Sequence, residues 1–284
     1  METSTVAIVG IESTHATEIV RHLNVHGAVE IPVRVAALVA GEVERTRELA
    51  ELGAITRIAA EPGELLGAVD GVIVTSRDGS HHRAEAVPFL EAGIPVWVDK
   101  PLATTVADAD AILEAARRGG TRVTSSSALR WLDDTAEIAA TLPTVGELRS
   151  LTVSGPADAE STHGGLFFYG IHHADLAQSL VPGVAEGVEI ERDEGRVVAR
   201  YRVGGVPVTL EFVRPEGDAA VPFRVTAVGS VGTVERDIAV GPGYLDPATD
   251  AFVRMLRTGE SPVPEAQQRE AIAVLEQITS ALAR

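Results

Sequence analysis

Two residues of the sequence have the side chains and positions required for acid–base chemistry at a carbon–oxygen group. Lys100 follows the apolar run of residues 94–98 (IPVWV) and Asp99. The run predicts a strand buried on both faces, and Pro101 bars the strand from continuing. In open α/β sheets, ligands bind outside the carboxyl ends of the strands, so Lys100 is expected where chemistry takes place. His172 supplies an imidazole, the side chain that titrates closest to neutral pH. We expect Lys100 and His172 to be the catalytic residues and to flank the reacting carbon.

A glycine turn near the N-terminus predicts a nucleotide site. Residues 5–10 read TVAIVG, an apolar strand pattern, and Gly10 leads into an amphipathic stretch for which Ser13 or Thr14 is the expected N-cap. Strand, tight turn and helix at the start of an α/β chain is typical of the Rossmann fold, which binds dinucleotides. We therefore expect NAD or NADP as cofactor, held in part by Gly10, Ser13 and Thr14.

The dinucleotide pattern departs from the usual one at two points. Glu12 and His15 stand where the second and third glycines of G-x-G-x-x-G would be. Ala40 stands at the end of the second strand, where an acidic residue usually binds the ribose hydroxyls. Glu42 is the better substitute for that acid, whereas Arg45 could meet the 2′-phosphate of NADP. The choice between NAD and NADP therefore stays open.

Apolar runs and amphipathic stretches alternate up to about residue 125, which predicts a parallel sheet with helices on both faces. Thr75 and Asp99 lie at the ends of two of these runs and are expected at the cofactor. The expected strands are 5–10, 31–40, 71–76, 94–98 and 122–125, and the expected helices begin near residues 14, 42, 82 and 106.

After Ser127 the pattern changes to successive strands joined by turn signals, which predicts an antiparallel sheet. The expected strands are 147–154, 188–192, 196–203, 206–213, 223–228 and 232–238, with helices at 133–141, 170–180, 247–257 and 265–282. The predicted fold class is α/β. A doubly wound Rossmann domain spans 1–126, and an α/β domain with an open-faced, mainly antiparallel sheet spans 127–284.

Composition excludes several classes of function. Lys and Arg total 24 against 41 Asp and Glu, a net charge of -17 that disfavours nucleic acid as a partner. Cysteine is absent, which removes disulfides and thiolate metal sites. No apolar run is long enough to span a membrane and the first residues lack a signal pattern, so a cytoplasmic protein is expected. The histidine pairs at 81–82 and 172–173 lack a diagnostic metal spacing, so no metal is expected.

Several stretches together resemble the Gfo/Idh/MocA oxidoreductase family, the glucose-fructose oxidoreductase and inositol dehydrogenase group. Asp99-Lys100-Pro101 is a conservative form of the family's Glu-Lys-Pro strand end, and residues 170–175 (GIHHAD) are similar to its Gly-x-His-x-x-Asp helix. The other similar stretches are His82, Arg130-Trp131, 146–150, 232–235 and the last two helices.

The resemblance implies a role for each matching residue. Lys100 would be the catalytic lysine, and His82 would lie at the cofactor. Tyr169, Arg130 and Asp175 are expected to bind a small-molecule substrate, although Arg130 could instead pair with an acidic residue. Asp175 lies three residues after His172, on the same helix face, and is expected to orient its imidazole. Family members commonly form homodimers or homotetramers through the open sheet, and the same is expected here.

The expected function is an NAD(P)-dependent oxidoreductase acting on a CH–OH group of a sugar, polyol or related molecule. Phe168 stands where the sugar oxidoreductases of the family often carry aspartate, four residues before His172. Two alternatives remain at this point. One is a redox-neutral lyase or glycosidase that uses bound NAD transiently, and the other is a non-catalytic sensor or scaffold with the same fold.

Overall fold

The computed structural model describes residues 3–27, 32–217 and 219–284, which form two compact units. The first unit comprises the described residues up to Ala103, together with Ala107–Ser125 and Leu245–Glu265. The second comprises Thr104–Val106, Ala266–Arg284 and the described residues between 126 and 244. Residue 31, where the second strand was predicted to begin, lies outside the described residues.

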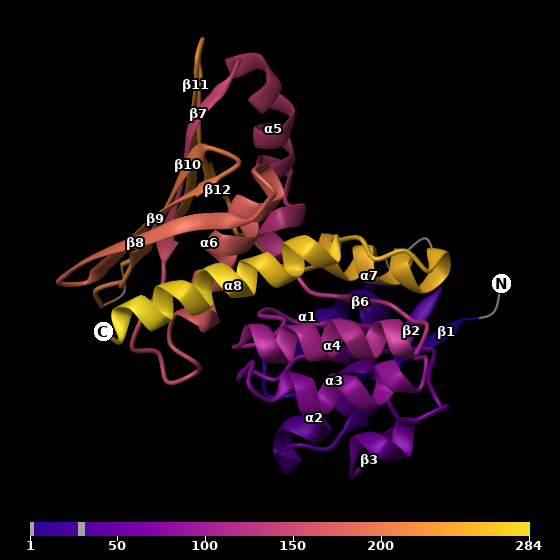
Figure 1. Ribbon diagram of the computed structural model, residues 1–284. Coiled ribbons are helices and arrows are strands. Elements are labelled where there is room, and N and C mark those ends of the chain that lie inside the picture. The colour runs from indigo at the N-terminus through magenta and orange to yellow at the C-terminus, as the bar shows by residue number, and fades with distance from the viewer. Residues whose placement is uncertain (1–2, 28–31, 218) are drawn as a thin grey trace. The chain divides into compact units, whose positions relative to one another are not determined.

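The first unit contains a six-stranded parallel sheet in the order β3-β2-β1-β4-β5-β6 (Figure 1). Its strands are β1 (Ser4–Val9), β2 (Val33–Val39), β3 (Arg57–Ala59), β4 (Gly71–Val74), β5 (Val96–Val98) and β6 (Val123–Thr124). The chain moves outward from β1 to β3 and then restarts on the other side at β4, the doubly wound order of a Rossmann fold. The predicted fold class is confirmed, although the three-residue strand β3 carries too little pattern to predict.

The central strands are buried on both faces. All four residues of β4 and all three of β5 are buried, as are the last four of β1. Such strands read as unbroken apolar runs because helices cover both sides of the sheet. The helices are α1 (Thr14–Val20), which continues as a π-helical segment Arg21–His26, α2 (Val43–Gly53), α3 (His82–Glu91), α4 (Val106–Arg118) and α7 (Asp246–Thr258).

Helix α7 packs with the first unit although it follows the second sheet in the sequence. The ring of Phe252 is fully buried and lies 5.8 Å from that of Trp97 on β5. His22 Nε2 lies 2.8 Å from the carboxylate oxygen Oδ1 of Asp250. Residues 245–265 were expected within one continuous segment, 127–284. The compact unit that contains them is instead that of the parallel sheet, because the apolar face of α7 is buried there.

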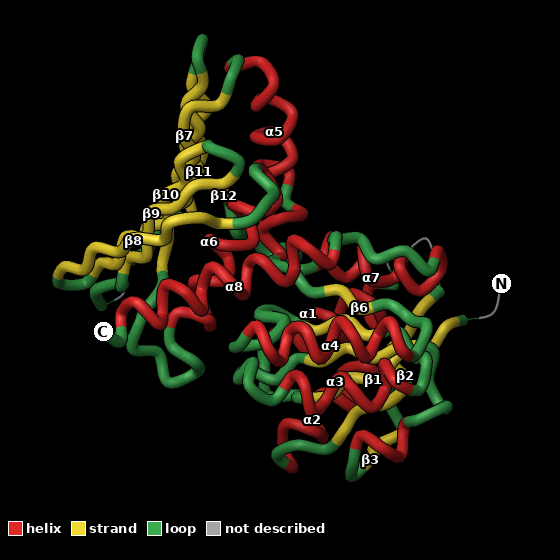
Figure 2. The backbone as a smooth tube through the Cα atoms, viewed as in Figure 1, coloured by secondary structure: helices red, strands yellow, loops and turns green. Residues whose placement is uncertain are grey.

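The second unit contains a six-stranded mixed sheet in the order β12-β11-β7-β10-β9-β8, in which only the β7–β10 pair is parallel. Figure 2 shows these strands gathered into one sheet. The strands are β7 (Leu148–Pro156), β8 (Ala185–Asp193), β9 (Arg196–Val203), β10 (Val206–Val213), β11 (Phe223–Gly229) and β12 (Thr233–Ile238). In β7 and β10 burial alternates with period two, so one face is buried and the other is more open.

Helix α6 packs against β7 and β10 on the buried face of this sheet. The helices of the unit are α5 (Asp133–Thr141), α6 (Leu166–Leu180) and α8 (Glu265–Leu282), with short 3₁₀ segments at Ala128–Trp131 and Leu142–Val145 and another in the first unit at Pro62–Leu65. Helix α6 begins four residues before the predicted start, so Phe168 and Tyr169 are helical. None of the helices in the described part of the chain has the length and apolarity needed to cross a membrane.

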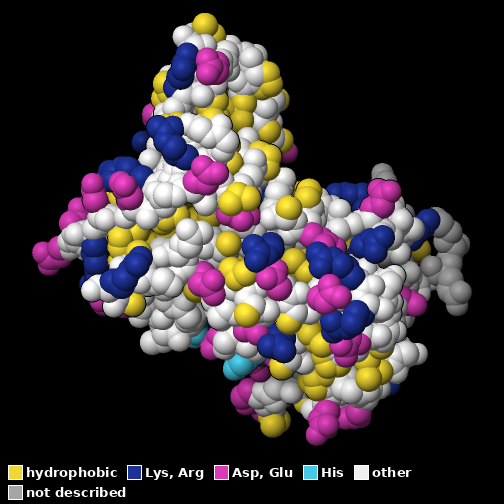
Figure 3. Space-filling view, viewed as in Figure 1, with side chains coloured by type: hydrophobic (Ala, Val, Ile, Leu, Met, Phe, Trp, Pro, Cys, Tyr) yellow, Lys and Arg dark blue, Asp and Glu magenta, His cyan; other side chains and the backbone are white. Residues whose placement is uncertain are grey.

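Surface charges add little to the stability of either unit. Figure 3 shows acidic and basic side chains interspersed on the face in view. Exposed ion pairs such as Arg118–Glu91, at 2.7 Å, join neighbouring helices of the first unit. Exposed pairs of this kind contribute about 0–1 kcal/mol each, whereas burying a single large apolar side chain contributes about 1.5–3 kcal/mol. The apolar cores therefore hold the functional residues in place.

Candidate active site

The glycine turn after β1 has no room for a side chain. Gly10 has φ +76°, and a Cβ there would meet the backbone and hydroxyl of Ser76. Thr75 Oγ1 donates to the Gly10 carbonyl at 2.6 Å, and Thr75 is fully buried. The turn is thus a close-packed cradle at the carboxyl end of β1, which fits a Rossmann nucleotide site. Thr75 was predicted to bind the cofactor, but its hydroxyl supports the turn from behind instead.

The loop between β1 and α1 is held by a guanidinium group. Ser13 is the N-cap of α1 and accepts from the backbone N–H of His15 at 3.2 Å, as predicted, while Thr14 is exposed at the first turn. Arg45, on α2, donates to the carbonyls of Ile11 and Ser13, both at 2.9 Å. It also donates to Thr17 Oγ1 at 2.7 Å. Arg45 therefore braces the loop, a role that sequence reasoning missed.

Lys100 leaves β5 at its carboxyl end and is only 9% exposed. Burial lowers the pKa of its ammonium group, because charge is poorly solvated there, while the negative charge of Asp99 opposes that effect. A lysine with a lowered pKa gives up its proton more readily than an exposed lysine, as acid–base chemistry requires. The geometry thus places a deprotonatable amine at the strand end where it was expected.

Asp99 is a buried carboxylate held by two partners. His15 Nδ1 lies 2.6 Å from its Oδ2, and the Lys100 backbone N–H donates to its Oδ1 at 2.9 Å. Burial by itself would raise the pKa of Asp99, but the charge and hydrogen bond of His15, together with Lys100, lower it to about 2. Asp99 is therefore ionised. It connects His15, in the first turn of α1, to the end of the strand that carries Lys100.

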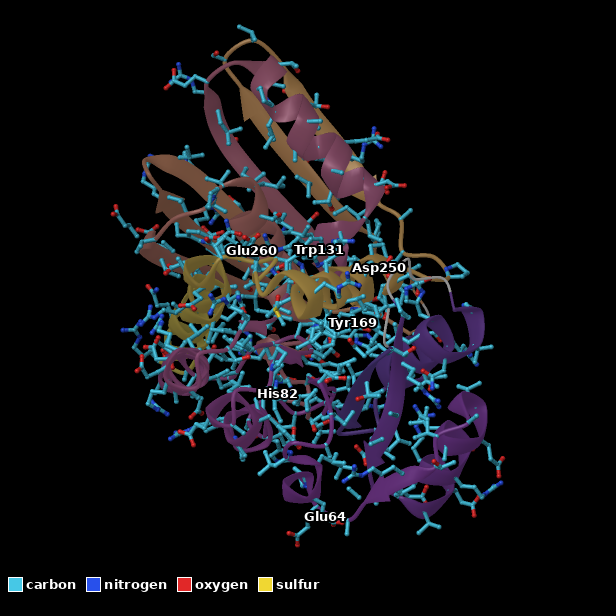
Figure 4. The ribbon with its side chains drawn as sticks, turned by 90° about the vertical axis from the view of Figure 1, so that its right-hand side faces the viewer. Glu64, His82, Trp131, Tyr169, Asp250 and Glu260 are labelled. Atoms are coloured by element: carbon cyan, nitrogen blue, oxygen red, sulfur yellow. The ribbon has the colours of Figure 1, made fainter. Side chains whose placement is uncertain are left out.

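His82 fixes the segment that carries the lysine. Its ring is fully buried on α3 (Figure 4), with Nδ1 2.7 Å from the Pro101 carbonyl and Nε2 2.9 Å from the Ser76 carbonyl. Both ring nitrogens are occupied by backbone groups. The expected contact between His82 and the cofactor is thus replaced by a structural tie between the ends of β4 and β5.

In the second unit, His172 is held by Ser127. The Ser127 hydroxyl lies 2.7 Å from His172 Nδ1, and Ser127 itself is fully buried as the N-cap of the segment Ala128–Trp131. Asp175 was expected to orient the imidazole, but its carboxylate binds elsewhere. Ser127 is therefore the positioning partner of His172. The Ser125-Ser126-Ser127 run before a helical segment was the only signal in the sequence that could have pointed to it.

Asp175 and Arg130 form a buried ion pair. The Arg130 Nε and Nη2 atoms donate to Oδ2 and Oδ1 of Asp175 at 3.0 and 2.8 Å, and the Ser127 backbone N–H donates to Oδ2 at 3.1 Å. The two side chains are only 10% and 3% exposed. Both residues were predicted to bind substrate, with ion pairing as the alternative for Arg130. The structure has the ion pair, in which each of the two charges neutralises the other.

Tyr169 is the most exposed aromatic residue of α6, at 42%. With Phe168 it lines a cavity of about 640 Å³ in the second unit, which residues from the end of β7 and the stretch before β11 also line. The Tyr169 ring lies 5.6 Å from that of His172 (Figure 4 labels Tyr169). The cavity wall at Tyr169 is therefore aromatic, and Phe168 makes it more apolar than a carboxylate would. The substrate role of Tyr169 stays a prediction.

His173, next to His172, lies in the core of the second unit. It is fully buried, with the rings of Phe212 and Phe223 at 4.7 and 5.4 Å. Burial lowers its pKa to about 4, so the ring is neutral at physiological pH. This agrees with the structural role expected for His173. Among the residues that the structure describes, no group of three or more potential ligands is arranged to hold a metal ion.

Comparisons with known proteins find one matching family model and several solved structures of the same fold. The profile of a family described as "Oxidoreductase family, NAD-binding Rossmann fold" matches residues 4–127. A comparison with curated proteins finds no match. The structure of myo-inositol 2-dehydrogenase from Lactobacillus plantarum is similar with a TM-score of 0.86 at 15% identity, covering 99% of this chain and 98% of that one.

Two further solved structures are similar over nearly the whole chain. GenD2 from gentamicin A biosynthesis, in complex with NAD, has a TM-score of 0.84 at 17% identity and covers 100% and 95% of the two chains. An oxidoreductase from Agrobacterium radiobacter in complex with NAD+, L-tartaric acid and magnesium has a TM-score of 0.81 at 15% identity, covering 100% and 97%. At such identities these similarities show a shared fold.

The family match spans the glycine turn, the parallel sheet and the lysine strand end of the first unit. It confirms the oxidoreductase class and the NAD-binding Rossmann fold expected from the sequence. Residues 4–127 of this chain match the model of the Gfo/Idh/MocA oxidoreductase family.

Proposed function

We propose that the protein is an NAD-dependent oxidoreductase that acts on a secondary alcohol or ketone of a sugar, polyol or related small molecule. The names of the similar structures support this substrate class, since two of them are an inositol dehydrogenase and an oxidoreductase bound to L-tartaric acid. The cavity beside Tyr169 and His172, with hydroxyl, carboxylate and aromatic groups in its wall, suits a small polar molecule.

The observation that carries the proposal is that Lys100 is the only lysine of the chain. The other 23 of the 24 Lys and Arg residues are arginine. Among the described residues, arginine is the cation of the exposed ion pairs, yet it cannot lose its proton in proteins, whereas a buried lysine can. A chain that keeps one lysine, and keeps it buried at a strand end with a lowered pKa, retains the amine for a reaction that needs proton transfer.

Lys100 would accept the hydroxyl proton during oxidation and return it during reduction. When bound, NAD supplies the hydride acceptor. The ionised Asp99 keeps the pKa of Lys100 from falling further, because its negative charge favours the ammonium form. His172, held by Ser127, would be the second acid–base group acting on the substrate. Gly10, Ser13 and Thr14 would hold the dinucleotide at the carboxyl end of β1.

The test compares Lys100→Arg and Lys100→Met with the natural protein. NAD reduction would be followed by nicotinamide absorbance with myo-inositol, scyllo-inositol and L-tartrate as probes. Both variants should lose about 10²–10⁴-fold in turnover, and NADH binding, measured by fluorescence, should be unchanged. Arg83→Met, which removes an exposed cation on α3, should keep full turnover. Full turnover by Lys100→Arg would show that only the positive charge matters and would refute proton transfer by this residue.

A single lysine also allows its titration to be observed directly. Reductive methylation with ¹³C-formaldehyde labels only Lys100 and the terminal amine. The pKa of the labelled amine should lie below the ordinary value of 10.5, and the rate of alcohol oxidation should rise with pH through the same value. Binding of NADH without turnover of any probe by the natural protein, combined with an ordinary lysine pKa, would instead favour the sensor or scaffold.

A homodimer or homotetramer is part of the same proposal. The face of the second sheet opposite α6 carries half-buried polar residues on adjacent strands, such as Thr152 on β7 and Thr209 on β10. Polar but partly covered strands of this kind suit an interface between copies. Sedimentation equilibrium would give the subunit number, and Thr152→Arg should shift it to monomer. The cytoplasmic location expected from the sequence also remains a proposal.

A further inference from the structure

The carboxylate of Glu12 lies beside the strand end at which the nucleotide pattern lacks its usual acid. It replaces the second glycine of the fingerprint, while Ala40 replaces the acid at the end of β2. In the structure the side chain of Glu12 lies against the residue that follows Ala40. A Cβ on Gly41, the residue after Ala40, would collide with Glu12 Oε1 and lie 2.9 Å from Ile11 Cγ1. The carboxylate of Glu12 thus lies directly against the backbone at the carboxyl end of β2, and Gly41 leaves room for it.

The backbone of Glu12 is fixed on both sides. Arg45 donates to the carbonyl of Ile11 before it and to the carbonyl of Ser13 after it. The side chain of Glu12 is exposed, and within the described residues it makes no hydrogen bond or ion pair. The result is an unpaired carboxylate on a braced loop, held at the strand end where Rossmann folds bind ribose hydroxyls.

The same bonds remove Arg45 as a ligand for a 2′-phosphate. Two of its three nitrogens are bound to Ile11, Ser13 and Thr17 at 2.7–2.9 Å, and the third lies 3.8 Å from Glu48. Glu42 is also occupied, because it caps α2 by accepting from the Arg45 backbone N–H at 2.9 Å. A phosphate placed here would meet the charge of Glu12, and Arg45 would have to give up its bonds to the loop to turn toward it.

We propose that Glu12 holds the ribose hydroxyls of the adenosine half of the cofactor and selects NAD over NADP. The carboxylate accepts from the 2′- and 3′-hydroxyls, a role usually filled by the strand-end acid, and repels a 2′-phosphate by its charge. The inference rests on the proposed function, because it requires the first unit to bind a nicotinamide dinucleotide. It differs from the substitution by Glu42 considered from the sequence.

Dissociation constants of NADH and NADPH, measured by fluorescence for the full chain, test the assignment. The natural protein should bind NADH at least about tenfold more tightly than NADPH. Glu12→Gln, which keeps the shape and removes the charge, should weaken NADH about tenfold and strengthen NADPH, since hydrogen bonds to a charged group are the stronger ones. Glu51→Gln removes an equal charge from an exposed position on α2 and should leave both constants within about twofold.

The possible results distinguish failure of the role inferred for Glu12 from failure of the proposed oxidoreductase function. Unchanged NADH and NADPH constants in Glu12→Gln, with normal thermal stability, would overturn the role of Glu12 and leave the oxidoreductase proposal standing. Tighter NADH binding in Glu12→Gln would also overturn it, because the carboxylate would then be repelling the pyrophosphate. Binding of neither nucleotide by the natural protein would refute the proposed function itself and the inference with it.

Discussion

Removing Asp175 should destabilise the second unit strongly, because it would leave a buried guanidinium without its partner. Asp175 and Arg130 are 3% and 10% exposed and are joined by two parallel bonds of 2.8 and 3.0 Å. Asp175→Ala also deprives the buried Ser127 N–H of its acceptor. Loss of one member of such a pair costs about 3–5 kcal/mol, most of it from the uncompensated charge that remains.

The size of the effect can be followed by thermal unfolding. In domains of 150–250 residues, about 1 kcal/mol corresponds to roughly 2–4 °C in Tm, so Asp175→Ala should lower the transition of this unit by about 6–20 °C. Circular dichroism and calorimetry would both report it. Arg130→Met should have a similar effect, since it leaves the carboxylate of Asp175 buried and unpaired.

The double variant Arg130→Met/Asp175→Leu distinguishes the unpaired charge from simple loss of contacts. Replacing both charges by apolar side chains of similar volume should recover most of the lost stability. Glu160→Gln, which breaks exposed ion pairs with Arg192 and Arg214, serves as the matched control and should change the stability by less than about 1 kcal/mol. A Tm for Asp175→Ala within about 2 °C of the natural protein would refute the reasoning.

Three further changes have effects that the structure determines. Gly10→Ala should cost at least about 1–2 kcal/mol, because φ is +76° and the new Cβ meets Ser76; NADH binding should weaken with it, as fluorescence would show. The pKa of His173 is lowered to about 4, so the stability that this residue contributes is complete above its ordinary pKa of 6.5 and is lost as pH falls toward 4. The free energy of unfolding in urea, compared at about pH 7 and about pH 4, should therefore change with pH by about 3 kcal/mol less in His173→Phe than in the natural protein. Asp99 contributes stability above its ordinary pKa of 3.8 that is lost as pH falls to about 2, so His15→Ala, by raising the pKa of Asp99, should make acid unfolding begin at higher pH.

The fold was predictable from the sequence because each strand and helix has its own pattern. The run of buried residues in β5 predicts a central parallel strand, and α4, β9, β10 and α8 have the bounds that were expected. Two elements were harder to place. β3 has only three residues, and the assignment of α7 to the first unit depends on contacts of Phe252 and His22 that no local pattern contains.

The site residues fall into two groups. Some are placed by the local sequence pattern, and the others depend on a partner that is distant in the sequence. The positions of Lys100 and Gly10 were predictable, because a strand end and a tight turn fix where these residues lie. His82, Thr75 and Asp175 were assigned to ligands, whereas the structure occupies each of them with protein groups.

The roles that the sequence missed depend on bonds between residues far apart in the chain. His15 meets Asp99 across 84 residues, and Ser127 meets His172 across 45. Spacing arguments reach only about one helical turn, so an acid three residues after His172 looked like its partner when a serine from another segment holds the ring. A histidine in a candidate site therefore identifies the chemistry, but the residue that orients it follows only from the tertiary structure. For this chain that makes Ser127→Ala, rather than a change at Asp175, the substitution that would report on the role of His172 without an unpaired buried charge.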